Sequence, residues 1–152
     1  MPTQVNKSAL VRFPAHMMYE LVDDIESYPK FLPWCKTSRI LRRSGDVVDA
    51  ELEISRGGFH KSFATRNTLL APQEIRMSLL SGPFEHLEGT WTFMPLRTDA
   101  SKISLDLEFE MSGKLASLAF GVVFNQICNT LVSAFSERAK TLYLYHHEDD
   151  AS

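Results

Sequence analysis

The chain has 152 residues, of which 44% are hydrophobic and 23% are charged, so it is long enough to enclose the core of one domain. Its formal net charge of −3 argues against a general nucleic-acid binder, and no DNA partner is expected. The two cysteines, Cys35 and Cys128, lack metal-ligand or redox spacing, which favours free thiols in a reducing compartment. We expect a single domain over residues 1–146 and a disordered tail over residues 147–152.

The first part of the chain predicts a strand followed by a helix. No apolar leader precedes them, which predicts a cytoplasmic protein. Apolar residues of one parity over residues 3–13 predict the strand, and Pro14 opens a helix whose apolar stripe runs from Met17 to Ile25. This helix should end before Tyr28, because the residue that precedes a proline avoids the helical region.

An apolar link follows at residues 28–35, with the sequence YPKFLPWC. Its two prolines, four positions apart, forbid a regular helix or a central strand. The bulky side chains of Phe31, Leu32 and Trp34 can therefore plug a core or form the rim of a pocket. The two roles can coexist, and the sequence leaves both open.

The middle of the chain predicts six further strands. Apolar and polar residues alternate along them, most clearly over residues 103–111, and short turns such as Gly57-Gly58 separate them. Successive strands joined by short turns form an antiparallel meander. The expected strands cover residues 38–43, 48–54, 59–70, 75–79, 87–93 and 103–111.

The last quarter of the chain predicts a long helix. No charged residue occurs over residues 115–136, but polar side chains gather on one side, which a lipid-facing helix would not keep. The apolar stripe starts at Phe120 and predicts an amphipathic helix of about 25 residues, roughly 37 Å long. A phase break at Gly121 predicts that residues 113–119 form a separate short turn capped by Ser112.

Together these elements predict an α+β fold in which one curved antiparallel sheet wraps around the C-terminal helix. The concave face would be rich in bulky side chains, which either fill the core or enclose an apolar ligand cavity. The candidate ligand-contacting residues outside the proline-containing link are Phe63, Thr65, Asn67, Met77, Leu79, Trp91, Phe93, Phe109, Phe124, Leu131, Phe135 and Arg138.

Three of these candidates are polar. Thr65 and Asn67 share the parity of Phe63, so they should face inward and either pair with the backbone or bind the polar head of a ligand. Arg138 lies at the edge of the helix stripe, where it can extend towards solvent or guard a cavity mouth. No catalytic residue, cofactor or metal site is expected, because the histidines lack ligand spacing and no phosphate-binding loop occurs.

The residues also resemble a known family, the coenzyme Q-binding START-like proteins. The link at residues 28–35 resembles the first signature of this family, and the segment from Gly82-Pro83-Phe84 to Leu96 resembles the second. The helix residues Phe135, Arg138, Ala139 and Tyr143 resemble the third. The likeness covers residues 3–145, and the compact length resembles the bacterial branch.

The resemblance implies a helix-grip (START/Bet v 1-like) fold of about seven strands. It also implies a non-enzymatic protein that binds ubiquinone or another polyprenyl lipid between sheet and helix, supports respiration and contacts a membrane transiently. The bacterial branch includes ribosome association toxins, which implies an alternative role as a translation inhibitor on the large ribosomal subunit. A weaker alternative is an aromatic polyketide cyclase or dehydrase, which would need a titratable group in the cavity.

Overall fold

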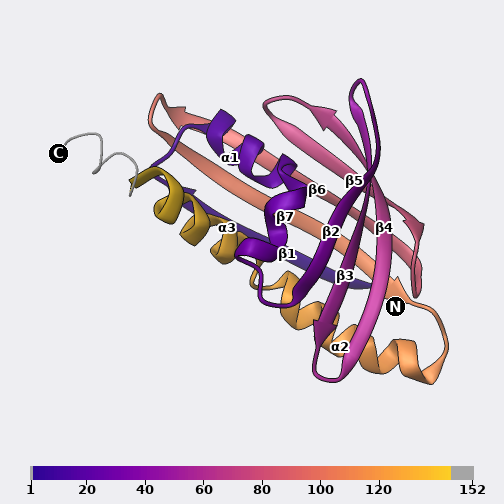
Figure 1. Ribbon diagram of the computed structural model, residues 1–152. Helices are drawn as coiled ribbons and strands as arrows, with labels where there is room; N and C mark the ends of the chain where they lie inside the picture. Colours follow the sequence, from indigo (N-terminus) through magenta and orange to yellow (C-terminus); the bar gives the residue numbers. More distant parts are fainter. Residues whose placement is uncertain (1, 145–152) are drawn as a thin grey trace.

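The computed structural model describes residues 2–144 and contains one seven-stranded antiparallel sheet (Figure 1). The sheet order β1-β7-β6-β5-β4-β3-β2 places the first strand beside the last. The predicted curved sheet around a C-terminal helix is confirmed, whereas the tail at residues 147–152 lies outside the described residues. The strands are β1 (Thr3–Val11), β2 (Cys35–Ser44), β3 (Val47–Arg56), β4 (Phe59–Leu70), β5 (Glu74–Ser81), β6 (Phe84–Arg97) and β7 (Ala100–Met111).

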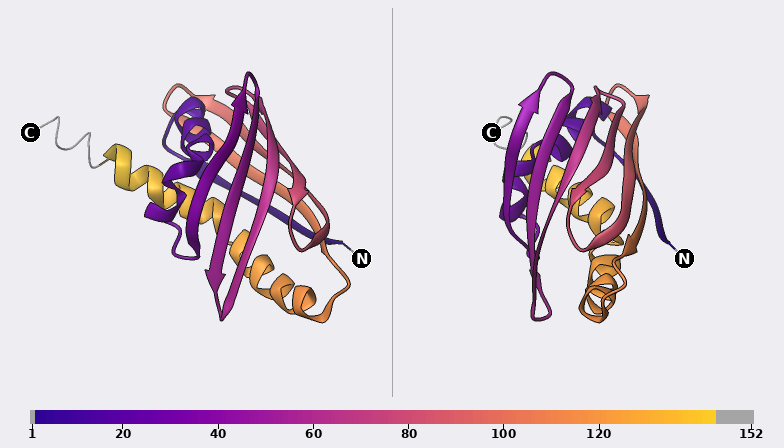
Figure 2. Two further views of the ribbon diagram at one scale, coloured as in Figure 1. Left: turned by 45° about the vertical axis from the view of Figure 1, so that its right-hand side comes forward. Right: turned by 90° about the vertical axis from the view of Figure 1, so that its right-hand side faces the viewer.

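The helices cover the concave face of this sheet (Figure 2). They pack there because each strand turns one apolar row inward, as β7 does with Ile103, Leu105 and Leu107, all buried. The helical elements are α1 (Ala15–Asp23), the 3-10 helix η1 (Ile25–Lys30), α2 (Leu115–Cys128), α3 (Leu131–Ala139) and the π-helical turn η2 (Lys140–Leu144).

The first helix and the link differ from the sequence prediction. Helix α1 ends at Asp23, and a 3-10 helix then continues to Lys30 with Pro29 inside it. This turn tolerates the proline because its hydrogen bonds come from other amides: Ser27 N donates to Asp24 O, and Phe31 N donates to Tyr28 O. The expectation that residues 28–35 exclude a helix is therefore wrong for their first three residues, and the remainder leads directly into β2.

The C-terminal helix is also interrupted at a different place. Helix α2 runs unbroken through Gly121 and stops at Cys128, so the predicted break at Gly121 and the cap at Ser112 are wrong. The interruption lies at Asn129-Thr130, where both side chains hydrogen-bond preceding carbonyls: Thr130 Oγ1 donates to Ile127 O at 2.7 Å, and Asn129 Nδ2 donates to Asn125 O at 2.8 Å. The long C-terminal helix is therefore present, but it is divided at this point into α2 and α3.

Gly121 has a packing role instead. A Cβ atom at this position would lie 2.7 Å from Met111 Cγ at the end of β7, so the missing side chain lets α2 approach the sheet. The apolar residues that lie out of phase with the helix stripe face solvent: Leu115, Leu118 and Val122 are 83%, 52% and 63% exposed. The two sets of apolar residues in the sequence therefore lie on two different faces of one helix, one buried and one exposed.

By length and composition alone, the helical stretch Leu115–Tyr143 could span a membrane, with a mean hydropathy of 1.5. In the structure its inner stripe covers the sheet, and Phe120, Phe124, Ile127 and Phe135 are each at most 4% exposed. Phe124 stands at the centre of an aromatic cluster, with ring centroids 4.9 Å from both Phe84 and Phe109. The apolar stripe of the helices is thus buried in the core of the domain.

Candidate functional site

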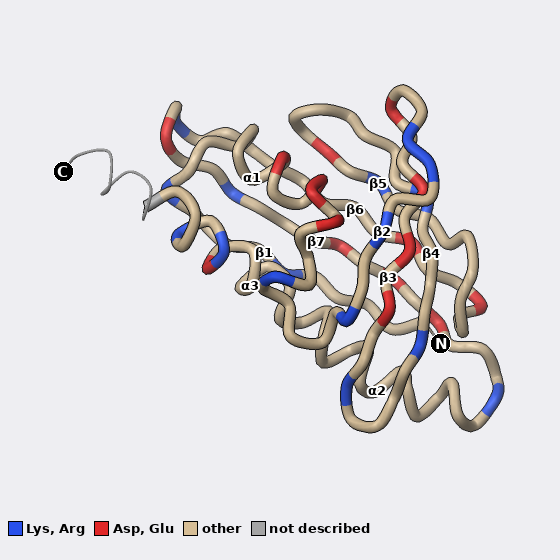
Figure 3. The backbone as a smooth tube through the Cα atoms, viewed as in Figure 1, with Lys and Arg blue, Asp and Glu red and all other residues tan. Residues whose placement is uncertain are grey.

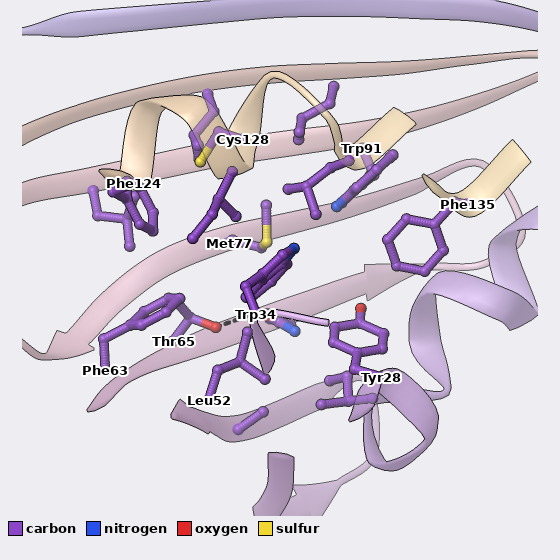
Figure 4. Close-up of a pocket in the computed structure, with 18 residues that line it drawn as sticks. Tyr28, Trp34, Leu52, Phe63, Thr65, Met77, Trp91, Phe124, Cys128 and Phe135 are labelled. Atoms are coloured by element: carbon purple, nitrogen blue, oxygen red, sulfur yellow. Dashed lines mark hydrogen bonds between the residues drawn. The ribbon is translucent and has the colours of Figure 1, made fainter. Parts of the chain in front are cut away.

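A small cavity remains between the sheet and the C-terminal helices (Figure 4). It is partly open and has a volume of about 90 Å³. Strands β3 to β7 form its floor, α2 and α3 form its roof, and the 3-10 helix and the link close one side. The lining residues are Ile25, Tyr28, Trp34, Ala50, Leu52, Phe63, Thr65, Asn67, Met77, Leu87, Trp91, Leu105, Leu107, Phe124, Ile127, Cys128, Leu131 and Phe135.

Nine of the fifteen candidate residues from the sequence lie in this lining. They come from three strands (β4, β5 and β6), the link and both helices, so the fold gathers residues that are up to 101 positions apart in the chain, from Trp34 to Phe135. Figure 4 shows Trp34, Met77 and Trp91 pointing into the centre of the cavity. The nine are Trp34, Phe63, Thr65, Asn67, Met77, Trp91, Phe124, Leu131 and Phe135.

The other six candidates do not line the cavity. Phe93 is 1% exposed and lies behind the wall, stacked on Trp91 with ring centroids 6.3 Å apart. Phe109 is 2% exposed and is held among the rings of Phe84 and Phe124. The remaining four are Phe31, Leu32, Leu79 and Arg138.

The link residues illustrate how packing separates these roles. Leu32 is 1% exposed and is part of the core, so it plugs the fold, whereas Trp34 lines the cavity. Phe31 packs edge-on against Phe135, with ring centroids 5.2 Å apart, and is therefore one ring removed from the cavity. Leu79 is partly buried and packs against the core. The link thus supplies both a core plug and a cavity rim.

Nine lining residues were missed from the sequence. Most are inward-facing residues whose parity was recognised but which were not selected because they are smaller than the aromatic candidates. Tyr28 had no periodic signal, since it lies in the 3-10 helix, although it belongs to the first family signature. The missed residues are Ile25, Tyr28, Ala50, Leu52, Leu87, Leu105, Leu107, Ile127 and Cys128.

The polar groups of the lining are few and uncharged. Thr65 and Asn67 are buried as predicted, and Thr65 Oγ1 donates to Asn67 Oδ1 at 2.9 Å. Because the Asn67 oxygen accepts this bond, its amide nitrogen is the group that can donate to a ligand. The Tyr28 hydroxyl donates to Val22 O, which fixes it at the cavity edge. None of the described lining residues is Asp, Glu, His, Lys or Arg.

Burial keeps the titratable lining groups neutral. Desolvation raises the pKa of the Tyr28 hydroxyl and that of the Cys128 thiol, both far above neutral pH. Cys35, the buried last residue of the link, likewise has its pKa raised to about 11, mainly by desolvation. Both cysteines are free and buried, and among the described residues no group of three His, Cys, Asp or Glu side chains could hold a metal ion. The cavity wall is therefore uncharged across the physiological pH range.

Arg138 lies outside the cavity, one layer further out. Its guanidinium carbon is 5.0 Å from the centroid of the Phe31 ring, a cation–π contact. Its Nε atom is buried and has no hydrogen-bond partner within the described part of the chain. The side chain is neither fully extended into solvent nor in contact with the cavity, so it combines features of the two expected roles.

The chain is similar in sequence to a known family and to several known proteins. Residues 11–136 match the family described as polyketide cyclase / dehydrase and lipid transport. A ribosome association toxin RatA from Pseudomonas aeruginosa is 43% identical over 143 residues, which cover 94% of this chain and 99% of that protein. The mitochondrial coenzyme Q-binding protein COQ10 homolog B of Xenopus laevis is 28% identical over 92% of this chain and 59% of its own length.

Solved structures share the fold. The Zhui aromatase/cyclase from a Streptomyces species superposes with a TM-score of 0.82 at 18% identity, over 95% of this chain and 98% of that chain. A START superfamily protein from Mycobacterium smegmatis superposes with a TM-score of 0.78 at 24% identity, over 91% and 98%. At these identities the likeness concerns the fold alone.

Proposed function

Because this chain belongs to the polyketide cyclase / dehydrase and lipid transport family, we propose that it binds a lipophilic small molecule in the cavity between the sheet and helices α2 and α3. Ubiquinone or another polyprenyl quinone is the proposed ligand class, and the proposed role is to carry or shield it without chemical conversion. The observation that carries this proposal is a wall of almost entirely apolar side chains, with one hydrogen-bonding pair, in the middle of the fold.

The chemistry of the wall suits a quinone head. Aromatic faces such as Trp34 and Trp91 can stack on a planar ring, and the Asn67 amide can donate a hydrogen bond to a ring carbonyl. An acid–base reaction would need a titratable group near the substrate. The described lining has only Tyr28 and Cys128, whose raised pKa values keep them protonated, and this supports binding rather than catalysis.

The size of the cavity requires that binding expand it. Ligand sites usually enclose about 300–1,000 Å³, and this cavity holds about 90 Å³. Met77 extends into its centre (Figure 4) and can change rotamer easily, because its side chain is unbranched. The interruption at Asn129-Thr130 is the proposed hinge at which α2 shifts relative to α3. The proposed ligand therefore enters by displacing Met77 and lifting the helical roof.

Intrinsic fluorescence offers a direct test. The chain has two tryptophans, Trp34 and Trp91, and both line the cavity, so a quinone that enters will quench both. We expect saturable quenching by a short-chain ubiquinone at one ligand per chain, retained in the single variants Trp34→Phe and Trp91→Phe. Native mass spectrometry of protein purified from its own host should show the bound lipid. Linear, unsaturable quenching together with a ligand-free mass would refute the proposal.

A second candidate function is association with the large ribosomal subunit. Its support is the 43% identity with the RatA protein over almost the full length of both chains. The arginines of β2 are partly neutralised, since Arg39 Nε lies 3.0 Å from Glu51 Oε1 and Arg43 Nη1 lies 3.4 Å from Asp23 Oδ2. An extended cationic surface for ribosomal RNA is therefore not formed there, which favours contact with a ribosomal protein.

Sedimentation separates the two candidates. Protein in a lysate should migrate with large-subunit fractions of a sucrose gradient if it associates with ribosomes, and reversing Arg39, Arg42 and Arg43 to Glu should release it if β2 takes part. Recovery only in the soluble fractions at low salt would count against ribosome association. Lipid binding can be scored on the same preparation, so that each function is accepted or rejected separately.

A further inference from the structure

The first two turns of α2 expose an apolar surface that the core does not use. Leu115, Leu118 and Val122 are 83%, 52% and 63% exposed, and they lie together on the outer side of the helix. Scattered single exposed apolar residues are ordinary, whereas a group of this kind on one helix marks a contact site. We define these three side chains as the α2 tip.

Basic residues lie on the segments next to the α2 tip. Exposed Lys114 precedes it, and the adjacent β3–β4 hairpin carries exposed Arg56 and half-buried Lys61. The hairpin lies against α2, because the rings of Phe59 and Phe120 are 5.8 Å apart. Figure 3 shows blue at the hairpin and before α2, with no red on either segment. Residues 56–61 and 112–136 contain three lysine or arginine residues and no aspartate or glutamate, although the whole chain has a negative net charge.

From this juxtaposition we propose that the α2 tip and the β3–β4 hairpin dock on an anionic phospholipid bilayer. Leucine and valine side chains insert below the headgroups, while Lys114 and Arg56 contact lipid phosphates. The protein has a negative net charge but one end that is positive. An anionic bilayer therefore attracts this end and orients the protein before contact. The charge pattern selects a membrane over a second copy of the chain, because two copies would bring the basic groups together.

Docking would also place the cavity roof at the bilayer. Phe124, Ile127 and Cys128, on the inner side of the same helix, line the cavity, and Phe63 on β4 lines it beside the hairpin. In the proposed movement, α2 shifts as a unit between the loop before Lys114 and the interruption at Asn129-Thr130. Lifting α2 while its tip is inserted would open the cavity towards lipid. This last step rests on the proposed ligand-binding function, whereas the docking surface does not.

Vesicle flotation tests the docking. The probes are vesicles of phosphatidylcholine alone and vesicles with a third of phosphatidylglycerol. We expect flotation of the wild-type protein with the anionic vesicles and at least a tenfold loss of binding in Leu115→Ser/Leu118→Ser/Val122→Ser. Lys114→Glu/Arg56→Glu should lose binding to the same extent and should abolish the dependence on anionic lipid. Because the substituted side chains are exposed, these variants should fold like the wild type, and circular dichroism and the urea midpoint check that they do.

A matched control lies elsewhere on the surface. Leu10, Met94 and Leu96 are exposed to similar fractions (74%, 51% and 50%), so Leu10→Ser/Met94→Ser/Leu96→Ser should float like the wild type. Failure of the wild type to float, or equal loss in the control, would overturn the proposal. The proposal would also be overturned if the wild type formed dimers in sedimentation equilibrium, or bound ribosomes, and only the α2-tip variant lost this property. Either result would show that the surface binds a second copy of the chain or a ribosome.

Quinone quenching in solution keeps this proposal distinct from the ligand-binding one. The α2-tip variant should retain quenching by a water-soluble short-chain quinone, because its substitutions face away from the cavity. Flotation without quenching would leave the docking surface intact and refute ligand binding. Quenching without flotation would refute docking and leave ligand binding intact.

Discussion

At the scale of single residues, the Thr65–Asn67 pair places polar atoms in an otherwise apolar wall. Thr65→Val removes the donor and leaves the buried Asn67 oxygen without its partner. We expect the free energy of unfolding in urea to fall by about 1–3 kcal/mol, the usual cost of an unpaired buried polar group. Thr68→Val, on the exposed side of the same strand, controls for the higher strand propensity of valine.

A second comparison isolates the hydrogen bond from side-chain volume. The double variant Thr65→Val/Asn67→Leu replaces both partners by apolar groups and should recover most of the lost stability. If it is less stable than Thr65→Val by a further 2 kcal/mol or so, the pair is not an isolated hydrogen bond and the explanation fails. Its quinone affinity should nevertheless fall, because the proposed donor to the ring carbonyl has been removed.

At the scale of elements, Gly121 decides how closely α2 approaches the sheet. Gly121→Ala gains about 1 kcal/mol of helix propensity, but its Cβ would lie 2.7 Å from Met111 Cγ. Overpacking costs about 1–3 kcal/mol, so we expect a net loss of stability of up to about 2 kcal/mol in urea unfolding. Gly113→Ala, where the new methyl meets no atom within 4 Å, should show no such loss.

A double-mutant cycle checks this cause. Met111→Ala should make Gly121→Ala favourable, because the helix gains propensity and the clashing side chain is gone; the coupling should be about 1–3 kcal/mol. Additive effects would show that Met111 is not the obstacle. This result would also show that α2 is held off the sheet by something other than the end of β7.

The elements also show which features of this fold are readable from sequence. The central strands were predictable because apolar residues alternate along one face, and β7 alternates over its whole length. The position of the helix interruption differs from the prediction because Gly121 lacks a side chain for close packing against Met111, and it does not break the helix. The signal lay instead in Asn129 and Thr130, whose side chains compete for backbone carbonyls.

At the scale of the whole molecule, the cavity was predictable in its composition but not in its depth. Trp91 and Phe93 have the same parity on β6, yet Trp91 lines the cavity and Phe93 lies behind it against Tyr19. Parity states which side of the sheet a residue faces. The space on that side is empty or filled depending on the curvature of the seven strands and on the position of α1. A local sequence pattern predicts neither of these.

The cavity therefore links the stability of the molecule to its proposed ligand. Ala50 lines the cavity and is 4% exposed, so Ala50→Val adds methyl groups to empty space and should stabilise the free protein by about 0.5–2 kcal/mol. Ala64, on the neighbouring strand, is 2% exposed but does not line the cavity, so Ala64→Val should overpack the core and destabilise it by about 1–3 kcal/mol. Urea unfolding measures both.

Ligand binding should change in the opposite sense from stability. A ligand that must expand a cavity of about 90 Å³ competes with any side chain that fills it. Ala50→Val should thus weaken quinone quenching at least several-fold while raising the urea midpoint. If Ala50→Val stabilised the protein and left quinone affinity unchanged, the quinone would bind elsewhere. If it destabilised the protein as much as Ala64→Val, the cavity would have no usable space, and the inward aromatic residues would serve the core alone.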